Sequence, residues 1–469
     1  MKMVQAIMLS ICVVLALTSQ SNNATGVTSA ETTASAEQML DEHYDHVFTT
    51  PLTITVGMRT SWRGLTILLQ NDLTVQGELL LDDANIVVDG KSTAVKLTVM
   101  YGGFLSVHGS NITKTKDGPS YSIIVGTFST MFVEESTISG LGENGLHFYG
   151  DQMIFNQSNL EASTTGLVGS GRVIVENSHF MNIDTYGLDL SSVNELALTN
   201  ITFSDNGVGL RLVGTKAVKL TNNWFMGNGQ ALVARSSTNF TLKSNNFQSS
   251  EVFDVTIEAS TRVNITQNTF QGSAGVILRV EDSTHISLTF NSLLGDNRGI
   301  VLAGKTSGIV QSNDFNTSGA SLEIEEEGDM TLLLVKLNNF YNYSEVVQRA
   351  KVTNQSTTLS FNYYKRHALL LKDIDLDGIA DRPLVGNGWK DLYPLTLPTY
   401  YYKTEQDNNS NNFVNDIHLA SPYANPLAMD PRVAVGPNIH LIFVLTYYTL
   451  FFVMAPVMGR WVIKKKAQS

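Results

Sequence analysis

The sequence predicts an all-β protein whose main domain is a right-handed parallel β-helix, a solenoid of about 12 to 13 coils. Two observations predict this fold. Short segments rich in Val, Ile, Thr and Phe alternate apolar with polar residues, which is the pattern of strands. A large apolar residue also closes each segment at intervals of 22 to 25 residues: Phe180, Phe203, Phe225, Phe247, Phe270, Leu293, Phe315, Phe340 and Tyr364. Stacked coils of this length bury one continuous core.

Two further motifs keep the same period. A glycine followed by Leu, Ile or Val, any residue and a second large apolar residue predicts a second strand in each coil and occurs at Gly145, Gly187, Gly209, Gly275 and Gly299. An asparagine lies two residues before the large residue at Asn223, Asn245, Asn268, Asn291, Asn313, Asn338 and Asn362. We expect these amides to bond to one another from coil to coil, as stacked asparagines do. The main alternative, a leucine-rich repeat, usually has more leucine and a helix in the variable segment.

The N-terminal segments are typical of an exported chain. Lys2 and the apolar run that follows predict a signal peptide over residues 1–20, with an uncleaved anchor as the alternative. Residues 21–39 are a Ser/Thr-rich linker, and residues 40–364 form the predicted β-helix. The single cysteine, Cys12, lies in the signal, so the mature chain has no disulfide and no thiol nucleophile.

The C-terminal segments predict a membrane anchor. Residues 439–459 contain 21 residues without a formal charge, and a helix of that length spans about 31 Å, close to the thickness of the bilayer core. Basic residues follow at once, at Arg460 and Lys464, so residues 460–469 are the predicted cytoplasmic tail. A buried core helix is the alternative. Residues 399–438 are the predicted stalk.

Charge and sequons indicate an extracytoplasmic surface, at the cell surface or in the periplasm. Between the signal and the tail, 26 basic residues face 43 acidic ones, a net charge of −17 that opposes binding to nucleic acid. Glycosylation sequons, which fit a glycoprotein, begin at Asn23, Asn111, Asn156, Asn200, Asn239, Asn264, Asn316, Asn342, Asn354 and Asn408. A glycan or another extracytoplasmic protein is the expected partner.

The stretch DIDLDGIADRPL follows the last coil and matches much of a calcium loop. Asp373, Asp375 and Asp377 stand at positions 1, 3 and 5, Ile379 at 7 and Asp381 at 9. Position 12 is leucine, where a bidentate glutamate normally completes the site. We therefore expect either a weak structural Ca²⁺ site or a turn whose carboxylates bond nearby amides. This stretch belongs to a predicted C-terminal cap over residues 365–398.

Coils ending in "NYY", then "D-x-D-x-DGIAD-x-P" and "D-x-YPL", resemble the NosD type of periplasmic β-helix protein and the wider group of carbohydrate-binding and sugar-hydrolase β-helices. The residues that carry the resemblance are Asn362 to Tyr364, Asp373 to Pro383 and Asp391 to Leu395. The resemblance covers roughly residues 64–395. It implies an accessory role such as copper-site maturation, although the predicted anchor departs from a free periplasmic protein.

Copper ligands are sparse in the sequence. His43 and His46 are three residues apart, and His179 lies near Met181, but neither pair is joined by an obvious third ligand. Copper sites with soft ligands need a fuller set of His, Met or Cys side chains. The sequence therefore favours Ca²⁺ over copper.

Catalytic candidates are also few. Asp189 and Arg211 are 22 residues apart, one coil, so they are expected to be vertical neighbours on an outer face. An exterior ion pair between coils is the favoured interpretation of these two residues. Tyr186 and Trp224 are candidates for stacking on sugars. The sequence thus favours a non-catalytic protein that binds a glycan or a protein partner. The alternative is a polysaccharide lyase, hydrolase or epimerase.

Overall fold

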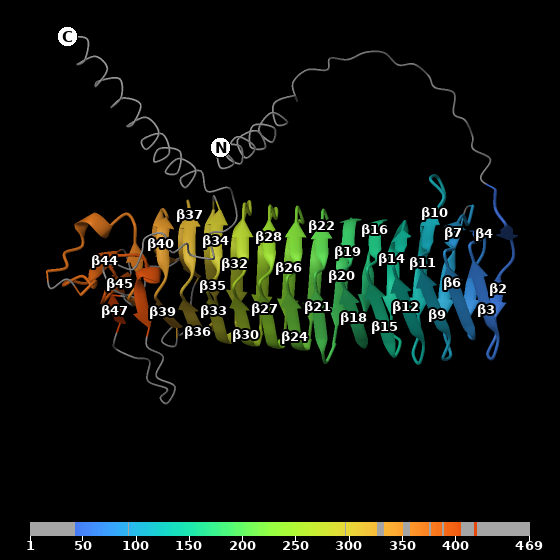
Figure 1. Cartoon of the computed structure of the whole chain (residues 1–469), viewed down its shortest axis with the longest axis horizontal. Coiled ribbons are helices and arrows are strands. Elements are labelled where there is room, and N and C mark those ends of the chain that lie inside the picture. Colours follow the sequence, from blue (N-terminus) through green and yellow to red (C-terminus); the bar gives the residue numbers. More distant parts are fainter. Residues whose placement is uncertain are drawn as a thin grey trace, which may run out of the picture. The chain divides into compact units, whose positions relative to one another are not determined.

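The computed structural model describes residues 43–91, 93–295, 297–325, 333–349, 357–374, 377–386, 389–404 and 417–419. The described residues from Tyr44 onward form one compact unit, most of which is a right-handed parallel β-helix with three strands per coil (Figure 1). The predicted signal, linker, membrane span and tail lie outside the described residues. Within the described part of the chain, no helix has the length and apolar character needed to cross a membrane.

The strands form three long sheets, here called A, B and C. Sheet A contains, in order, β1 (His46–Phe48), β4 (Thr66–Leu69), β7 (Asn85–Val88), β10 (Asn111–Lys114), β13 (Thr137–Ser139), β16 (Asn159–Ser163), β19 (His179–Ile183), β22 (Thr202–Ser204), β25 (Trp224–Met226), β28 (Asn246–Gln248), β31 (Thr269–Gln271), β34 (Ser292–Gly295), β37 (Asp314–Thr317), β40 (Asn339–Asn342) and β43 (Tyr363–Tyr364).

Sheet B contains β2 (Leu52–Ile54), β5 (Leu73–Val75), β8 (Lys96–Val99), β11 (Tyr121–Val125), β14 (Leu141–Phe148), β17 (Leu167–Gly169), β20 (Tyr186–Ser191), β23 (Val208–Val213), β26 (Gln230–Arg235), β29 (Phe253–Glu258), β32 (Val276–Glu281), β35 (Arg298–Ala303), β38 (Ala320–Glu325) and β41 (Glu345–Arg349).

Sheet C contains β3 (Arg59–Arg63), β6 (Glu78–Asp82), β9 (Phe104–His108), β12 (Thr130–Glu134), β15 (Gln152–Asn156), β18 (Arg172–Glu176), β21 (Leu196–Thr199), β24 (Lys216–Thr221), β27 (Thr238–Lys243), β30 (Thr261–Thr266), β33 (Thr284–Thr289), β36 (Gly308–Gln311), β39 (Leu333–Lys336), β42 (Thr357–Ser360), β45 (Trp389–Asp391) and β44 (Leu384–Gly386). Short 3₁₀ helices η2 (Ala368–Leu370) and η3 (Thr399–Tyr401) and the antiparallel pair β46 (Tyr402–Thr404) and β47 (Ile417–Leu419) complete the described elements.

The solenoid is slightly longer than predicted. Sheet B has 14 described strands, which makes about 14 coils against the expected 12 to 13. The first coils lack the Asn–Phe signature and fill the core with aliphatic residues such as Ile67 and Ile86, so the sequence period is weaker there. At the N-terminal end, β1 is the outermost strand of sheet A, and Phe48 stacks on Trp62 at 5.7 Å between ring centroids.

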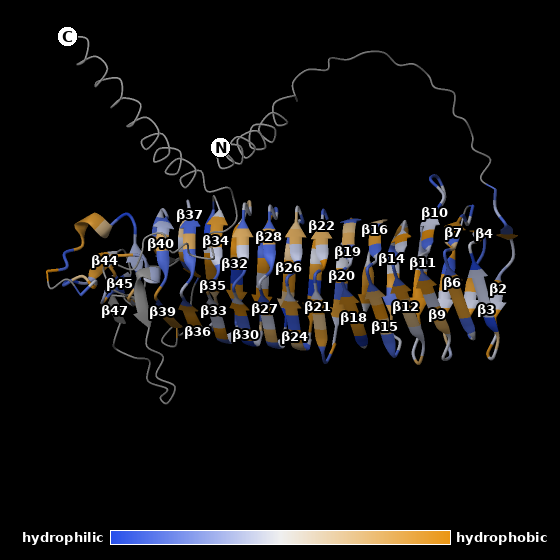
Figure 2. Ribbon diagram, in the orientation of Figure 1, coloured by the Kyte–Doolittle hydropathy of each residue, from blue (hydrophilic) through white to orange (hydrophobic). Residues whose placement is uncertain are grey.

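Alternation along the strands places one face of each sheet inside. In β12 and β15, buried residues alternate with more exposed ones, and Figure 2 shows hydrophobic and hydrophilic residues mixed along the strands in the same way. Strand pairing brings equivalent residues of successive coils into register, so each inner position becomes a column along the solenoid. The core is therefore a set of stacked columns.

The predicted phenylalanine ladder is confirmed. Phe203, Phe225, Phe247 and Phe270 are fully buried, and their ring centroids lie 4.9, 4.7 and 4.8 Å apart in nearly parallel planes. The ladder continues after Leu293 through Phe315, Phe340 and Tyr364, and Trp389 of β45 stacks on Tyr364 at 5.5 Å.

The predicted asparagine ladder is also confirmed. The Oδ1 of Asn268 accepts hydrogen bonds from the backbone amide of Asn245 at 2.8 Å and from its side-chain amide at 3.0 Å. The Nδ2 of Asn268 donates to Asn291 Oδ1 at 3.0 Å and to the carbonyl of Leu242 at 2.8 Å. The same bonds link the predicted asparagines from Asn223 to Asn362. Buried side-chain amides are thereby paired at each of these bends.

Candidate functional site

Sheet B carries a polar group on its outer face that is built from the third position of a repeated motif. GLHF, GLDL and GLRL place His147 on β14, Asp189 on β20 and Arg211 on β23. Strand register puts Arg211 directly beside Asp189, as predicted, and Val168 separates Asp189 from His147. We call the group formed by these residues with Tyr149 and Tyr186 the His147 cluster.

Contacts within the His147 cluster join charged and aromatic groups. Arg211 Nε lies 3.5 Å from Asp189 Oδ1, and the guanidinium carbon lies 4.7 Å from the centroid of the Tyr186 ring. His147 Nδ1 lies 2.9 Å from Tyr149 Oη. The Asp189 side chain is 14% exposed and that of Arg211 is 36% exposed. The cluster therefore presents a guanidinium, two aromatic rings and an imidazole to solvent, above a mostly covered carboxylate.

Burial shifts Asp189 and His147 toward their neutral forms. Desolvation raises the pKa of Asp189, and the charges of Arg211 and His147 oppose that shift. Desolvation lowers the pKa of His147, and the charge of Asp189 opposes it. A neutral imidazole has one donor nitrogen and one acceptor nitrogen, and because Nδ1 is bonded to Tyr149 Oη, Nε2 is the nitrogen left for a ligand.

The structure brings together Tyr186, Asp189 and Arg211, which the sequence singled out, but not Trp224. Trp224 lies on sheet A and is 49% exposed. His147 and Tyr149 were missed by the sequence analysis. His147 could have been found by aligning the motif GLHF with GLDL and GLRL, because it occupies the same third position as Asp189 and Arg211. Tyr149 has no such signal, because its position beside His147 depends on the turn after β14.

Further along sheet B, a second charged group is already neutralised by ion pairs. Arg279 contacts Glu281 at 3.1 Å and Glu325 at 2.7 Å, while Arg298 contacts Glu323 at 2.9 Å. Such exterior pairs contribute little to stability and leave each guanidinium engaged. This part of the sheet is less suited than the His147 cluster to binding a ligand.

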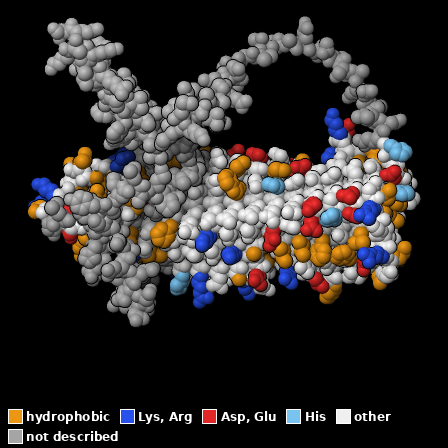
Figure 3. Space-filling model, viewed as in Figure 1, with side chains coloured by type: hydrophobic (Ala, Val, Ile, Leu, Met, Phe, Trp, Pro, Cys, Tyr) orange, Lys and Arg blue, Asp and Glu red, His pale blue; other side chains and the backbone are white. Residues whose placement is uncertain are grey.

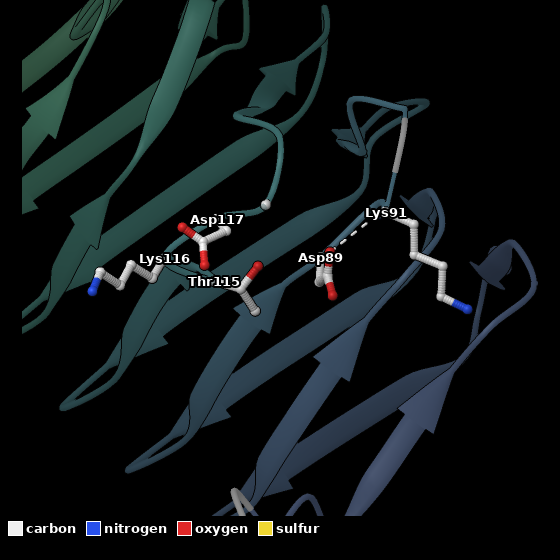
Figure 4. Close-up of a pocket in the computed structure, with 6 residues that line it drawn as sticks. Asp89, Lys91, Thr115, Lys116 and Asp117 are labelled. Atoms are coloured by element: carbon white, nitrogen blue, oxygen red, sulfur yellow. Dashed lines mark hydrogen bonds between the residues drawn. The ribbon is translucent and has the colours of Figure 1, made fainter. Parts of the chain in front are cut away.

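A pocket of about 410 Å³ lies at turns between sheets A and B near the N-terminal end. Asp89, Lys91, Thr115, Lys116 and Asp117 line it together with a glycine (Figure 4). The two lysine side chains extend away from each other, and the backbone amide of Lys91 donates to Asp89 Oδ1 at 3.1 Å. Two acids and two bases make the lining electrically balanced.

The predicted calcium loop has most of its carboxylates bonded to backbone amides. Asp373 Oδ2 accepts from Gly378 N at 2.9 Å, and Asp377 Oδ1 accepts from Ile379 N at 2.7 Å. Asp381 Oδ2 accepts from Ile374 N at 2.8 Å. The other oxygen of Asp373, Oδ1, is buried and has no hydrogen-bond partner.

Asp375, the remaining predicted ligand, lies outside the described residues. In the described part of the chain, no three His, Cys, Asp or Glu side chains are grouped as a metal site requires. The copper candidates His46 and His179 lie on β1 and β19, which are far apart in the order of sheet A. His43 is exposed at the first described position.

Three solved structures match this chain at low similarity. Tailspike protein 3 of bacteriophage CBA120 has a TM-score of 0.41 and 12% identity over 63% of this chain and 58% of its own, so this chain spans less than two thirds of it. PfbA, a surface adhesin of Streptococcus pneumoniae, has a TM-score of 0.32 and 14% identity over 57% of this chain and 84% of its own. The periplasmic alginate epimerase AlgG has a TM-score of 0.30 and 12% identity, over 64% and 70%.

No curated protein matches the sequence. One family does: residues 165–366 match the family described as periplasmic copper-binding protein (NosD). The match begins within the turn before β17 and ends after β43, so it covers the coils in which the phenylalanine and asparagine ladders are most regular. We conclude that this chain carries a NosD-like right-handed parallel β-helix.

Proposed function

We propose that this protein is an extracytoplasmic binding protein that holds a glycan on the outer face of sheet B, at the His147 cluster. The observation that carries the proposal is the position of Arg211, which lies over the ring of Tyr186 and beside Asp189 of the preceding coil. An aromatic ring offers a flat apolar surface to a sugar ring, while guanidinium, carboxylate and imidazole groups bond its hydroxyls.

The extracytoplasmic location rests on the sequence features and on the family. Three sequence features support export: the signal-like N-terminus, the sequons and the net charge of −17. The matching family is also described as periplasmic. We retain the single-pass anchor over residues 439–459 as part of the proposal. A NosD-like accessory role in metalloenzyme maturation is the corresponding proposal for a protein partner.

A polysaccharide-active enzyme is the second candidate, and the contact between His147 and Tyr149 favours it. An imidazole bonded to a phenol is a pair able to transfer protons, and burial raises the pKa of Asp189 above that of an exposed carboxyl. Asp189 and His147 are two coils apart, so a substrate would have to span both. Binding needs no such arrangement and is the simpler proposal.

We also propose that the Asp373 loop binds Ca²⁺ as a structural ion. The buried, unpartnered Oδ1 of Asp373 supports this, because a buried carboxylate oxygen without a partner is costly and a hard cation would satisfy it. Asp377, Asp381 and the carbonyl of Ile379 are the other described donors. They would have to exchange amide contacts for the ion.

Binding is tested with the full chain on a glycan array, followed by calorimetry with each glycan that binds. Arg211→Met and Asp189→Asn change the cluster, and Arg235→Ala is the matched control because Arg235 forms an ion pair with Glu258 on the same sheet face. We expect the two cluster variants to weaken binding at least tenfold and the control to leave it unchanged.

The same preparations are incubated with each bound polysaccharide, and products are followed by chromatography and by ultraviolet absorbance. Binding without turnover supports the first candidate. Turnover that His147→Gln abolishes while binding persists establishes the second. An array on which no glycan binds the wild-type chain contradicts both.

A further inference from the structure

Exposed aromatic side chains occupy three successive turns between sheets B and C. Tyr101 follows β8, Phe128 follows β11 and Tyr149 follows β14, which are adjacent strands of sheet B. Their exposed fractions are 73%, 76% and 49%. We call residues 100–103, 126–129 and 149–151 the aromatic turns. Each of these three coils thus presents one aromatic ring to solvent along the same edge of the solenoid.

Two of these rings are held by an unfavourable backbone conformation. Tyr101 has φ 56° and Phe128 has φ 60°, in the left-handed region that large side chains rarely adopt. Leu337 and Phe361 share the conformation, but Leu337 is buried and Phe361 stacks on Tyr393. Tyr101 and Phe128 gain no comparable burial. The left-handed backbone at these two residues is unfavourable, and packing of the side chains does not offset its cost. This combination indicates that the exposed rings have a function.

Phe290 is the informative exception, and it provides a control. It has φ 56° and is 47% exposed, but the equivalent residues of the neighbouring coils, Gln267 and Ser312, are polar. A single exposed ring therefore occurs elsewhere on the solenoid. Aromatic residues on consecutive coils distinguish the aromatic turns.

Apolar side chains continue from the aromatic turns onto the outer face of sheet C. Phe104 and Phe132 pack edge to face at 5.2 Å, and Ile154 and Ile174 extend the row along the next two coils. All four are half-buried. Figure 3 shows hydrophobic side chains gathered in a row over the strands β6 to β18. At the other side, Tyr149 contacts His147, so the surface is continuous with the His147 cluster.

We infer that the aromatic turns are stacking subsites for a linear, uncharged polysaccharide that runs along the solenoid axis from Tyr101 to the His147 cluster. Adjacent strands are about 4.8 Å apart, which is close to the repeat of an extended hexopyranose chain, so successive sugar rings meet successive coils. The apolar C–H face of a pyranose suits an exposed aromatic ring. The inference rests on the proposed function and adds the class and direction of the ligand.

The charges of this surface favour an uncharged ligand. The aromatic turns contain no Lys or Arg and one acid, Asp151. One coil beyond Tyr149, the exposed Arg172 begins β18 in register with Gln152, and Arg211 further along faces Asp189. A polyanionic chain would find no unpaired cation along the aromatic turns and would be repelled by the acidic domain.

The test uses the full chain and three neutral hexasaccharides, cellohexaose, mannohexaose and chitohexaose, with hexagalacturonate as the anionic counterpart. Tyr101→Asn and Phe128→Asn remove one ring each and introduce a residue that tolerates left-handed φ. Phe290→Asn makes the same change outside the surface. Calorimetry gives affinities, and thermal unfolding gives the midpoint of each variant.

We expect at least one neutral hexasaccharide to bind and its trisaccharide to bind at least tenfold more weakly. Tyr101→Asn and Phe128→Asn should each weaken hexasaccharide binding about tenfold while the unfolding midpoint stays equal or rises. Phe290→Asn should leave the affinity unchanged. Loss of affinity together with retained or increased stability excludes a merely structural role for the two rings.

Other outcomes separate this inference from the proposed function. If a neutral hexasaccharide binds and Arg211→Met weakens it, but neither ring variant does, the inference is wrong and the proposed function stands. If the ring variants lose affinity and Arg211→Met does not, the aromatic turns are the site and the His147 cluster is not. Tighter binding of hexagalacturonate overturns the uncharged class. If no neutral hexasaccharide binds, the inference is wrong, and the proposed function is still decided by the glycan array.

Discussion

Asp391 ends the asparagine ladder by taking the place of the next asparagine. Its Oδ2 accepts from the backbone amide of Asn362 at 3.1 Å and from the side-chain amide of Asn362 at 3.0 Å, the same two bonds that each asparagine accepts from the coil before. Tyr364 Oη also donates to Oδ2 at 2.8 Å, and Tyr393 N donates to Oδ1 at 3.0 Å. A carboxylate has only acceptor atoms, so it satisfies these donors. Unlike an asparagine, it has no N–H group that would need an acceptor in a further coil.

Replacing Asp391 with alanine is expected to destabilise the C-terminal coils by about 3 kcal/mol or more, because buried donors lose their acceptor. Asp391→Asn is expected to cost less, since its carbonyl still accepts from Asn362. Urea unfolding followed by the fluorescence of Trp389, which stacks on Tyr364, reports these coils. A loss of under 0.5 kcal/mol in Asp391→Ala would contradict the role of the carboxylate.

Phe247 tests the phenylalanine ladder. It is fully buried and stacks on Phe225 and Phe270, so Phe247→Ala should cost about 3 to 5 kcal/mol of unfolding free energy. Trp224→Ala on the adjacent strand β25 is the control: Trp224 is 49% exposed, and its loss should change stability by about 0.5 kcal/mol or less. The unfolding free energies of both variants are measured with denaturant. Equal losses of stability would mean that the ladder position contributes no more packing energy than an exposed position.

Asp254 is expected to make stability depend on pH. It is fully buried on β29, and desolvation raises its pKa from 3.8 to about 7, with Ser250 opposing the shift. The native state therefore keeps a proton that the unfolded state releases, so stability falls as pH rises from about 4 to about 7. The loss amounts to about 4 kcal/mol at higher pH.

Asp254→Asn removes this charge and should make the protein more stable than wild type at pH 8, with little difference at pH 4. Unfolding free energies of the two proteins across that range measure the effect. A difference that does not change with pH would show that Asp254 titrates alike in the folded and unfolded chain.

Calcium should raise the unfolding midpoint if the Asp373 loop binds it. At a concentration about ten times the dissociation constant, the gain in stability is about 1.4 kcal/mol. Asp373→Asn should abolish the gain, since it alters the buried unpartnered oxygen. Asp151→Asn, an exposed acid elsewhere, is the control. An equal calcium effect in wild type and Asp373→Asn would place the ion at another site.

The candidate site was only partly predictable. The one-coil spacing placed Asp189 beside Arg211, because strand pairing in a solenoid turns sequence period into vertical contact. His147 shares the motif position of these two but lies two strands away along sheet B, where the period is irregular. Tyr149 and Phe128 depend on the paths of individual turns. Turn length varies from coil to coil and carries no periodic signal.

The sequence by itself determined the solenoid and its two ladders, because a repeated pattern of alternating apolar residues, phenylalanine and asparagine leaves each coil no other way to bury its inner face and pair its amides. It also indicated where the stack ends. Only the tertiary structure decided which outer side chains meet. It showed that Asp391 closes the amide ladder across 29 residues and that Tyr149 reaches His147. These contacts depend on non-repeating turns, whose backbone paths are fixed by packing against neighbouring coils.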